Sequence, residues 1–357
     1  MGPIFVPDSF GGQWSAPEVA TLFEEALAGH GIFLDSHPMS DGGEGLIDAL
    51  LAHGSMELHG VEVTGPETDP VFATIGRRDG VWWIESAEAI GLNHTTTKIS
   101  PLTRSSYGLG SLIAEATQRH GGPLMVGLGG VGTVDGGLGA LQALGLTATD
   151  MHGSIIASPA TGAHLDGVRA LHGEIKFPNI LLRVLADVRS TVEQAAALYG
   201  PQKGLQPNDI PTMADALRRW TDTLNQWRDS HGWKPIHPAT VGGGAAGGLG
   251  FALAAIGGTI TGGAQQFANL TGLARRIEEA EVVIIGEGRL DATSFEGKVA
   301  GTVLELAHRA GRPVLALVGQ ADHVPPPPDG PREIIEINGV EDQHIQAAAT
   351  RLAGLLA

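Results

Sequence analysis

The stretch Val282-Val283-Ile284-Ile285-Gly286-Glu287-Gly288-Arg289 indicates the fold class of this chain. Its four apolar residues are typical of a buried strand, which is predicted to end where the glycine-rich polar segment begins. The N-terminus has the same arrangement, with the apolar residues Ile4 to Val6 before Pro7-Asp8-Ser9 and a predicted helix over 15–28 that starts at Ser15. Such strand-then-helix segments predict an α/β protein, in which ligands bind beyond the carboxyl ends of the strands.

The middle of the chain has a mixed pattern. Residues 71–75 and 81–85 are predicted to be antiparallel strands around the turn at Arg78-Asp79-Gly80. We therefore predict two domains: a Rossmann-like α/β domain built from both termini (1–65 and 279–357) and an inserted, mixed α/β domain (66–278). Further strands are expected at 32–34, 124–128, 181–186, 314–318 and 334–337, and helices at 46–52, 105–117, 138–144, 214–227, 247–256, 298–309 and 342–355.

Composition excludes several classes of protein. The chain has 357 residues, a net charge of −17 and no cysteine, so disulfides, thiolate nucleophiles and Cys-ligated zinc are excluded. The acidic balance argues against a general nucleic-acid surface. The N-terminus lacks the features of a signal peptide, and no apolar run reaches the about 18 residues of a membrane-spanning helix. We expect a cytoplasmic protein without nucleic-acid or membrane partners, and a homo-oligomer is left open.

Six glycine-rich motifs carry the functional signal. Glycine allows sharp turns that present backbone N–H groups to an anion, and neighbouring Asp, Arg and Lys side chains can hold a metal–phosphate group. The pattern therefore favours phosphoryl transfer, with local cations and a divalent metal offsetting the negative charge of the chain. The motifs are PDSFGG (7–12), SDGGEG (40–45), GLGGVGTVDGG (127–137), GPQKG (200–204), GGGAAGGLG (242–250) and GEGRLD (286–291).

The order and spacing of these motifs resemble the bacterial type I glycerate kinase family over nearly the whole chain. The resemblance implies a two-domain enzyme that phosphorylates D-glycerate with ATP and Mg²⁺ in an interdomain cleft, giving 2-phosphoglycerate in the cytoplasm. The chain departs from the family pattern within three motifs, and the main polar losses are at three positions: Gly11 stands where the family has Lys, and Val134 and Ser190 stand where it has Asn. These departures affect the expected substrate contacts.

Site residues are predicted from the motifs and from the resemblance together. Asp187 follows a predicted strand and matches the family's Asp in a Cys-Asp-Val motif, so we expect it to be the base that accepts the hydroxyl proton. Arg289 and Lys298 are the other expected catalytic residues, because a guanidinium and an ammonium at a helix start suit phosphate or carboxylate. Asp8, Asp41 and Asp291 are the expected metal ligands. Substrate or nucleotide contacts are expected at Ser9, Gly42, Gly43, Glu44, Gly129, Gly130, Asp135, Lys203, Gly286 and Gly288.

Structural roles compete with each of these predictions. Asp8 and Asp41 could be helix N-caps, Asp187 could cap a loop, and Arg289 could pair with Asp291 in a local turn. Lys203 could be an ordinary surface charge.

Two other functions remain open at the level of the sequence. Gly127-Leu128-Gly129-Gly130-Val131-Gly132, with Asp150 beyond it, matches the dinucleotide-binding pattern of an NAD-dependent dehydrogenase. The three family departures would also suit a homologue that binds glycerate or nucleotide without transferring phosphate. A P-loop NTPase is the least favoured function, since its Gly-Lys-Ser/Thr motif is missing.

Overall fold

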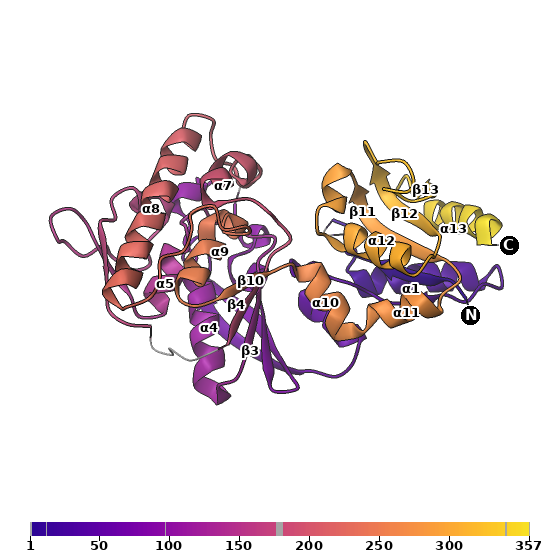
Figure 1. Ribbon diagram of the computed structural model, residues 1–357, viewed down its shortest axis with the longest axis horizontal. Helices are drawn as coiled ribbons and strands as arrows, with labels where there is room; N and C mark the ends of the chain where they lie inside the picture. The colour runs from indigo at the N-terminus through magenta and orange to yellow at the C-terminus, as the bar shows by residue number, and fades with distance from the viewer. Residues whose placement is uncertain (1, 12, 97, 176–180, 340, 357) are drawn as a thin grey trace. The chain divides into compact units, whose positions relative to one another are not determined.

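The computed structural model describes residues 2–11, 13–96, 98–175, 181–339 and 341–356, so Gly12 of the first motif lies outside the described residues. The chain divides into two compact units, Met1–Ser55 with Gly262–Ala357, and Met56–Thr261. Colour along the chain in Figure 1 shows that the first unit combines both ends of the sequence, whereas the second is one continuous segment. The predicted α/β fold class is confirmed.

The sheet of the first unit is entirely parallel, in the order β13-β12-β11-β1-β2. Parallel strands buried on both faces read as continuous apolar runs, which explains the strand signals at both ends of the sequence. On one face, α1 and α13 pack against Phe5, Ile284 and Leu317 of the sheet. The strands are β1 (Ile4–Pro7), β2 (Asp35–Ser36), β11 (Val283–Leu290), β12 (Val314–Ala321) and β13 (Glu333–Glu336), and the helices are α1 (Ala16–Ala28), α2 (Leu46–Ala52), α10 (Gly263–Thr271), α11 (Leu273–Glu279), α12 (Val299–Arg309) and α13 (Asp342–Leu356).

Helix α1 begins where the sequence predicts. The Glu18 amide donates to Ser15 Oγ at 3.4 Å, and the Ser15 amide donates to Glu18 Oε2 at 2.7 Å. This reciprocal capping box satisfies two amides that the first helical turn leaves without partners. The segment from Pro7 to Ser15 is thus fixed between a strand end and a capped helix.

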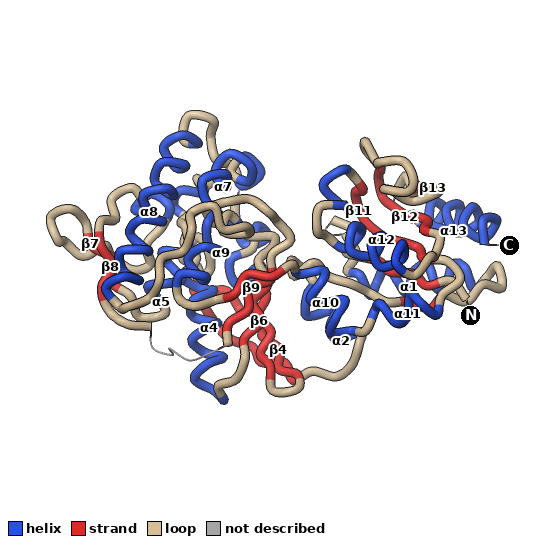
Figure 2. The backbone as a smooth tube through the Cα atoms, in the orientation of Figure 1, coloured by secondary structure: helices blue, strands red, loops and turns tan. Residues whose placement is uncertain are grey.

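The sheet of the second unit is mixed, in the order β10-β9-β6-β5-β4-β3 (Figure 2). β3, β4 and β5 pair antiparallel as predicted for 71–85, whereas β5, β6, β9 and β10 run parallel. The strands are β3 (Glu57–Thr64), β4 (Pro70–Arg78), β5 (Val81–Glu85), β6 (Leu124–Gly127), β7 (Thr147–Thr149), β8 (Ala170–His172), β9 (Leu182–Leu185) and β10 (Thr259–Thr261). The α-helices are α3 (Ser86–Ile90), α4 (Tyr107–His120), α5 (Leu138–Ala143), α6 (Gly162–Leu165), α7 (Val192–Tyr199), α8 (Ile210–Ser230) and α9 (Ala245–Ala255).

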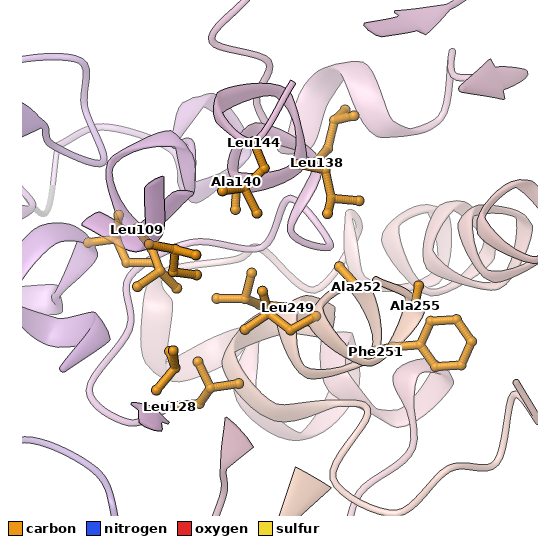
Figure 3. Close-up of a cluster of buried hydrophobic side chains, with 14 of the residues drawn as sticks. Leu109, Leu128, Leu138, Ala140, Leu144, Leu249, Phe251, Ala252 and Ala255 are labelled. Carbon is orange, nitrogen blue, oxygen red and sulfur yellow. The ribbon is translucent and has the colours of Figure 1, made fainter. Parts of the chain in front are cut away.

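A single large core holds the second unit together. Four leucines at its centre are at most 3% exposed: Leu109, Leu128, Leu138 and Leu249. Figure 3 shows them converging from α4, α5, α9 and the loop after β6. Burial of this kind contributes about 25 cal/mol per Å² of apolar surface removed from water. The core therefore fixes the loops that leave the carboxyl edge of this sheet.

The structure differs from the sequence predictions at several boundaries. The strand predicted at 32–34 is a two-residue strand at Asp35–Ser36. The units divide at 55/56 and 261/262, earlier than the predicted boundaries at 65/66 and 278/279. The reasons are that all of β3 pairs with β4 and that α10 and α11 pack against α12. Among the described residues, no helix combines the length and apolarity needed to cross a membrane.

Candidate active site

Acidic side chains gather at the carboxyl edge of the parallel sheet in the first unit. Asp8 follows β1, and Asp41 lies between β2 and α2. The pKa of Asp8 is raised well above its ordinary value, mainly because it is buried and then because the carboxylates of Asp41 and Glu287 are near, while Lys298 acts in the opposite direction. The predicted residues Asp41 and Lys298 are thus both within electrostatic range of Asp8.

Glu287 belongs to the same cluster, although the sequence analysis missed it. Burial raises the pKa of Glu287 to about 7, against the opposing effects of a hydrogen bond from Ser294 and the charge of Lys298. Ser294 Oγ donates to Glu287 Oε1 at 3.0 Å, while the buried Oε2 has no hydrogen-bond partner among the described residues. An acidic residue between two glycines at the end of a buried strand was the available signal.

Arg289 lies at the solvent-exposed side of this edge. Its guanidinium is 3.8 Å from Asp291 Oδ2 and 3.3 Å from Asp322 Oδ2, and its side chain is 60% exposed. Asp291 Oδ1 in turn accepts hydrogen bonds from the Thr293 amide at 2.8 Å and hydroxyl at 2.6 Å, which lower the pKa of Asp291 and cap the short 3₁₀ helix Ala292–Phe295. The local pairing considered for Arg289 and Asp291 is therefore present, and Arg289 remains accessible to an anion.

Gly286 and Gly288 lie inside β11, so the prediction that the strand ends at Ile285 is wrong. A methyl group at Gly286 would lie 2.9 Å from Phe5 and Pro7, and one at Gly288 would lie 3.0 Å from Phe10 Cα. β11 pairs with β12 as far as Leu290. Glycine at these positions allows the chain around β1 to approach β11 closely.

The loop after β2 uses its own side chains to hold its amides. Gly42 donates to Ser40 Oγ at 3.1 Å, and Gly43 donates to Asp41 Oδ1 at 2.8 Å. Both amides predicted to meet an anion are therefore engaged within the loop. Ser9 lies beside Asp8 and is half-buried, whereas the side chain of Glu44 is exposed.

A second group of predicted residues lies at the carboxyl edge of the parallel strands in the second unit. Gly129 and Gly130 follow β6, and Asp187 follows the neighbouring strand β9. Ser86, at the end of β5, donates from Oγ to the Gly129 carbonyl at 3.4 Å. Asp187 is half-buried, as a base that meets a substrate hydroxyl would be.

Asp135 and Lys203 are buried and hydrogen-bonded inside the second unit. Asp135 accepts from the Ser106 amide and hydroxyl at 2.8 and 2.7 Å and from the amides of Gly137 and Gly139 at 3.2 and 3.1 Å. Burial raises its pKa, although these bonds oppose the shift. Lys203 Nζ donates to the Thr133 carbonyl at 2.7 Å, and burial lowers the pKa of Lys203 to about 7. Because both side chains are buried, contact of either with a ligand would require the surrounding chain to move.

The three departures from the family pattern have different structural settings. Gly11 is exposed and has φ +55°, a conformation that favours glycine over the lysine of the family. Val134 is 2% exposed and packs in the large core, so an apolar side chain suits its surroundings. Ser190 is buried, and its hydroxyl has no partner among the described residues.

The dinucleotide-binding pattern is not supported by the topology around it. β7 is the first strand after this loop and its helix, and it pairs antiparallel with β8 in a separate two-stranded sheet, whereas a Rossmann unit requires that strand to lie parallel in the same sheet as β6. Asp150 Oδ1 accepts from the amides of His152 and Ser154 at 2.8 and 2.9 Å, which makes it a turn residue.

The described residues contain no group of three or more His, Asp or Glu side chains placed to hold a metal ion, so Asp8, Asp41 and Asp291 are not assembled as a ready-made three-ligand site. Mg²⁺ commonly takes only one or two carboxylates, with water and substrate phosphates completing its shell. Asp8 and Asp41 are the two predicted ligands that influence each other electrostatically.

Comparison with known proteins gives the family. The model of the Glycerate kinase family matches residues 4–348. The glycerate 2-kinase of Escherichia coli K12 is 31% identical over 334 residues, covering 89% of this chain and 85% of the relative. The glycerate kinase of Haemophilus influenzae Rd is 34% identical over 328 residues, covering 88% and 85%. A crystal structure of a proposed glycerate kinase 2 from Salmonella typhimurium LT2 has a TM-score of 0.80 at 31% identity and covers 100% of this chain and 98% of its own. The resemblance seen in the sequence is thereby confirmed: this chain belongs to the glycerate kinase family and is a glycerate kinase.

Proposed function

We propose that the enzyme transfers the γ-phosphoryl group of ATP directly to D-glycerate, with Mg²⁺, to give 2-phosphoglycerate. The observation that carries the proposal is the convergence of Asp8, Asp41, Glu287 and Lys298 at the carboxyl edge of a parallel sheet, within a chain of this family. Position 2 of glycerate is favoured because the Escherichia coli relative is a glycerate 2-kinase.

In this proposal the first unit binds the metal ion and neutralises the negative charge of the phosphates. Asp8 and Asp41 hold Mg²⁺, which neutralises phosphate oxygens when bound. Lys298 precedes α12, where its ammonium and the positive end of the helix both favour phosphate. Arg289 offers a planar fork to a carboxylate or phosphate, and its exposure leaves that fork open to solvent.

The second unit supplies the proton acceptor. Asp187 takes the proton of the glycerate hydroxyl while the oxygen of that hydroxyl forms a bond to the γ-phosphorus of ATP. ADP leaves with the electrons of the broken P–O bond. Gly129 and Gly130 bind the substrate near this edge. The interdomain cleft, the cytoplasmic setting and the role of each lysine are parts of the proposal that rest on the family resemblance.

A coupled assay of ADP release tests the proposal. Turnover is expected with D-glycerate, ATP and Mg²⁺ and is expected to stop when EDTA removes the metal. Phosphorus and proton NMR of the product should place the phosphate on C2, and phosphate on C3 would overturn the regiochemistry. L-glycerate serves as the matched control substrate.

A non-catalytic homologue is the second candidate, and the departures at Gly11, Val134 and Ser190 favour it. It predicts binding of ATP or D-glycerate in a calorimeter without ADP release above background. The burial of Val134 in the core weakens this alternative, because an asparagine there would have no access to solvent.

A further inference from the structure

Three buried side chains hold the backbone of the glycine-rich loop Gly127–Gly137. Arg104 Nη1 donates to the Gly132 carbonyl at 3.2 Å, Lys203 Nζ to the Thr133 carbonyl at 2.7 Å, and Trp220 Nε1 to the Gly136 carbonyl at 2.8 Å. These donors come from three separate segments of the second unit. The loop is therefore held from outside, at carbonyls that would otherwise be buried without partners.

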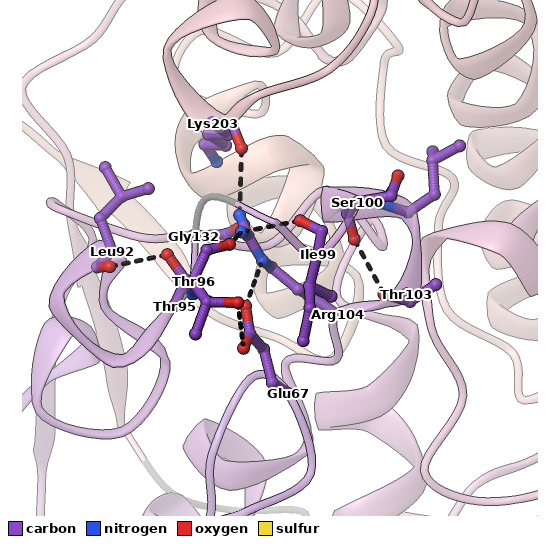
Figure 4. Close-up of polar contacts among 11 residues, drawn as sticks. Glu67, Leu92, Thr95, Thr96, Ile99, Ser100, Thr103, Arg104, Gly132 and Lys203 are labelled. Carbon is purple, nitrogen blue, oxygen red and sulfur yellow. Dashed lines mark hydrogen bonds and ion pairs between the residues drawn. The ribbon is translucent and has the colours of Figure 1, made fainter.

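Arg104 is the centre of this arrangement (Figure 4). Its Nε donates to Glu67 Oε1 at 3.2 Å, Nη1 also donates to the Lys203 carbonyl at 3.0 Å, and Nη2 donates to the carbonyls of Thr96 and Ile99 at 2.9 and 3.1 Å. The side chains of Arg104 and Glu67 are 2% and 5% exposed. Every donor of the guanidinium is used, so the buried charge is both paired and hydrogen-bonded.

Lys203 is joined to Arg104 through its own backbone and to the loop through its side chain. It is 6% exposed, and the charge of Asp135 in the same loop favours its ammonium form. One of its three N–H donors is used by the Thr133 carbonyl, and because the side chain is buried a phosphate could reach the others only if the surrounding chain moved. A lysine that binds phosphate at the surface would instead have a solvent-accessible ammonium group.

We propose that Lys203 and Arg104 are positioning residues that hold the loop Gly127–Gly137 in its binding shape, and that Lys203 does not contact phosphate. This rests on the proposed function only in assigning Gly129 and Gly130 of the same loop to substrate. The Gly130 carbonyl accepts from the Leu92 amide at 2.8 Å, and the Gly132 amide donates to Ile90 at 2.9 Å. The stretch that follows Gly129 is thus anchored along both its amides and its carbonyls.

Hydrogen exchange on the ligand-free enzyme tests this directly. In Lys203→Met, which has an unbranched side chain one atom shorter and removes the donors, amides of 127–137 should exchange at least about tenfold faster than in the wild type. The matched control is Lys234→Met, an exposed lysine of the same unit, which should leave exchange in this loop unchanged. Because no ligand is present, this result is independent of whether D-glycerate is the substrate.

Kinetics separate positioning from phosphate binding. A displaced loop lowers kcat as well as raising a KM, and a displacement of about 1 Å can cost about 10²-fold in rate. Unchanged exchange in 127–137, together with a raised KM for ATP at normal kcat, would instead make Lys203 a phosphate ligand and overturn the proposal. If Lys203→Met does not fold, Arg104→Lys keeps the positive charge but cannot bond both Glu67 and the Gly132 carbonyl as the guanidinium does, and unchanged exchange of 127–137 in that variant overturns the proposal equally.

Discussion

Gly263 offers a way to displace the Asp41 loop without touching a charged residue. A methyl group on Gly263 would overlap the carbonyl oxygen of Asp41 and lie 3.0 Å from the Gly42 amide nitrogen. The backbone of Gly263, the first residue of α10, has an ordinary φ, so alanine is strained there only by this contact. Because nonbonded heavy atoms settle about 3.5 Å apart, the loop must move by roughly 1–2 Å.

We expect Gly263→Ala to lower kcat/KM by about 10²-fold, since a misplacement of about 1 Å near reacting groups has an effect of that size. Overpacking should also reduce the free energy of unfolding by about 1–3 kcal/mol. The assay is coupled ADP release with D-glycerate, performed at a temperature where thermal melting shows the variant to be folded.

Gly262→Ala is the matched control for this experiment. Gly262 precedes Gly263, is exposed, and would place its methyl group 4.0 Å from Gln265 Cβ, which is ordinary contact. Its kcat/KM should stay within about twofold of the wild type, as surface substitutions usually change stability by no more than about 0.5 kcal/mol. A folded Gly263→Ala enzyme with the kinetics of this control would refute the assignment of the Asp41 loop to the active site.

Three further predictions concern single side chains. Asp187→Asn should lower kcat by about 10²–10⁴-fold with little change in nucleotide affinity, and an unaffected kcat would remove Asp187 from the role of base. Arg289→Ala should mainly raise the KM for D-glycerate or ATP, measured by steady-state kinetics, and a change confined to kcat would contradict a binding role. The pKa of Glu287 rises from 4.5 to about 7 on folding, so between pH 4.5 and about 7 the folded protein binds more protons at this side chain than the unfolded chain does. The free energy of unfolding therefore falls as pH rises through this range. Urea melts at pH 5 and pH 8 should show Glu287→Gln reducing this loss by about 2–3 kcal/mol, and an unchanged pH dependence would count against the buried setting of Glu287.

The sequence predicted the fold class well because its signals are local. Apolar runs such as Val283 to Ile285 are typical of buried parallel strands wherever they occur, and the capping box of Ser15 and Glu18 is complete within four residues. Boundaries were harder to predict because they depend on pairing between distant segments. The extension of β11 to Leu290 requires β12 beside it, and nothing in residues 286–290 reveals that partner.

The candidate site was predictable in position but not in detail. The carboxyl ends of parallel strands place Asp8 and Asp41 at one edge, and this follows from topology alone. The burial of Lys203 was not predictable. The sequence of a glycine-rich motif is the same whether the lysine ammonium binds phosphate or donates to a carbonyl such as that of Thr133. Glu287 was missed because its place between two glycines was the one sequence signal, whereas its buried Oε2, which lacks a hydrogen-bond partner among the described residues, depends on the folded surroundings.

The pairing of β1 with β11 has a consequence for how the chain is made. β1 ends at Pro7 and its neighbour in the sheet, β11, begins at Val283, so most of the chain is synthesised between these two strands. At about 5–20 residues per second, roughly 15–55 s pass between their synthesis. During that interval the apolar N-terminal segment has only the two-residue strand β2 to pair with, while the second unit, a continuous stretch ending at Thr261, already has all of its strands. Nascent chains stalled before residue 283 should therefore bind chaperones through their first residues, and release should follow translation of β11.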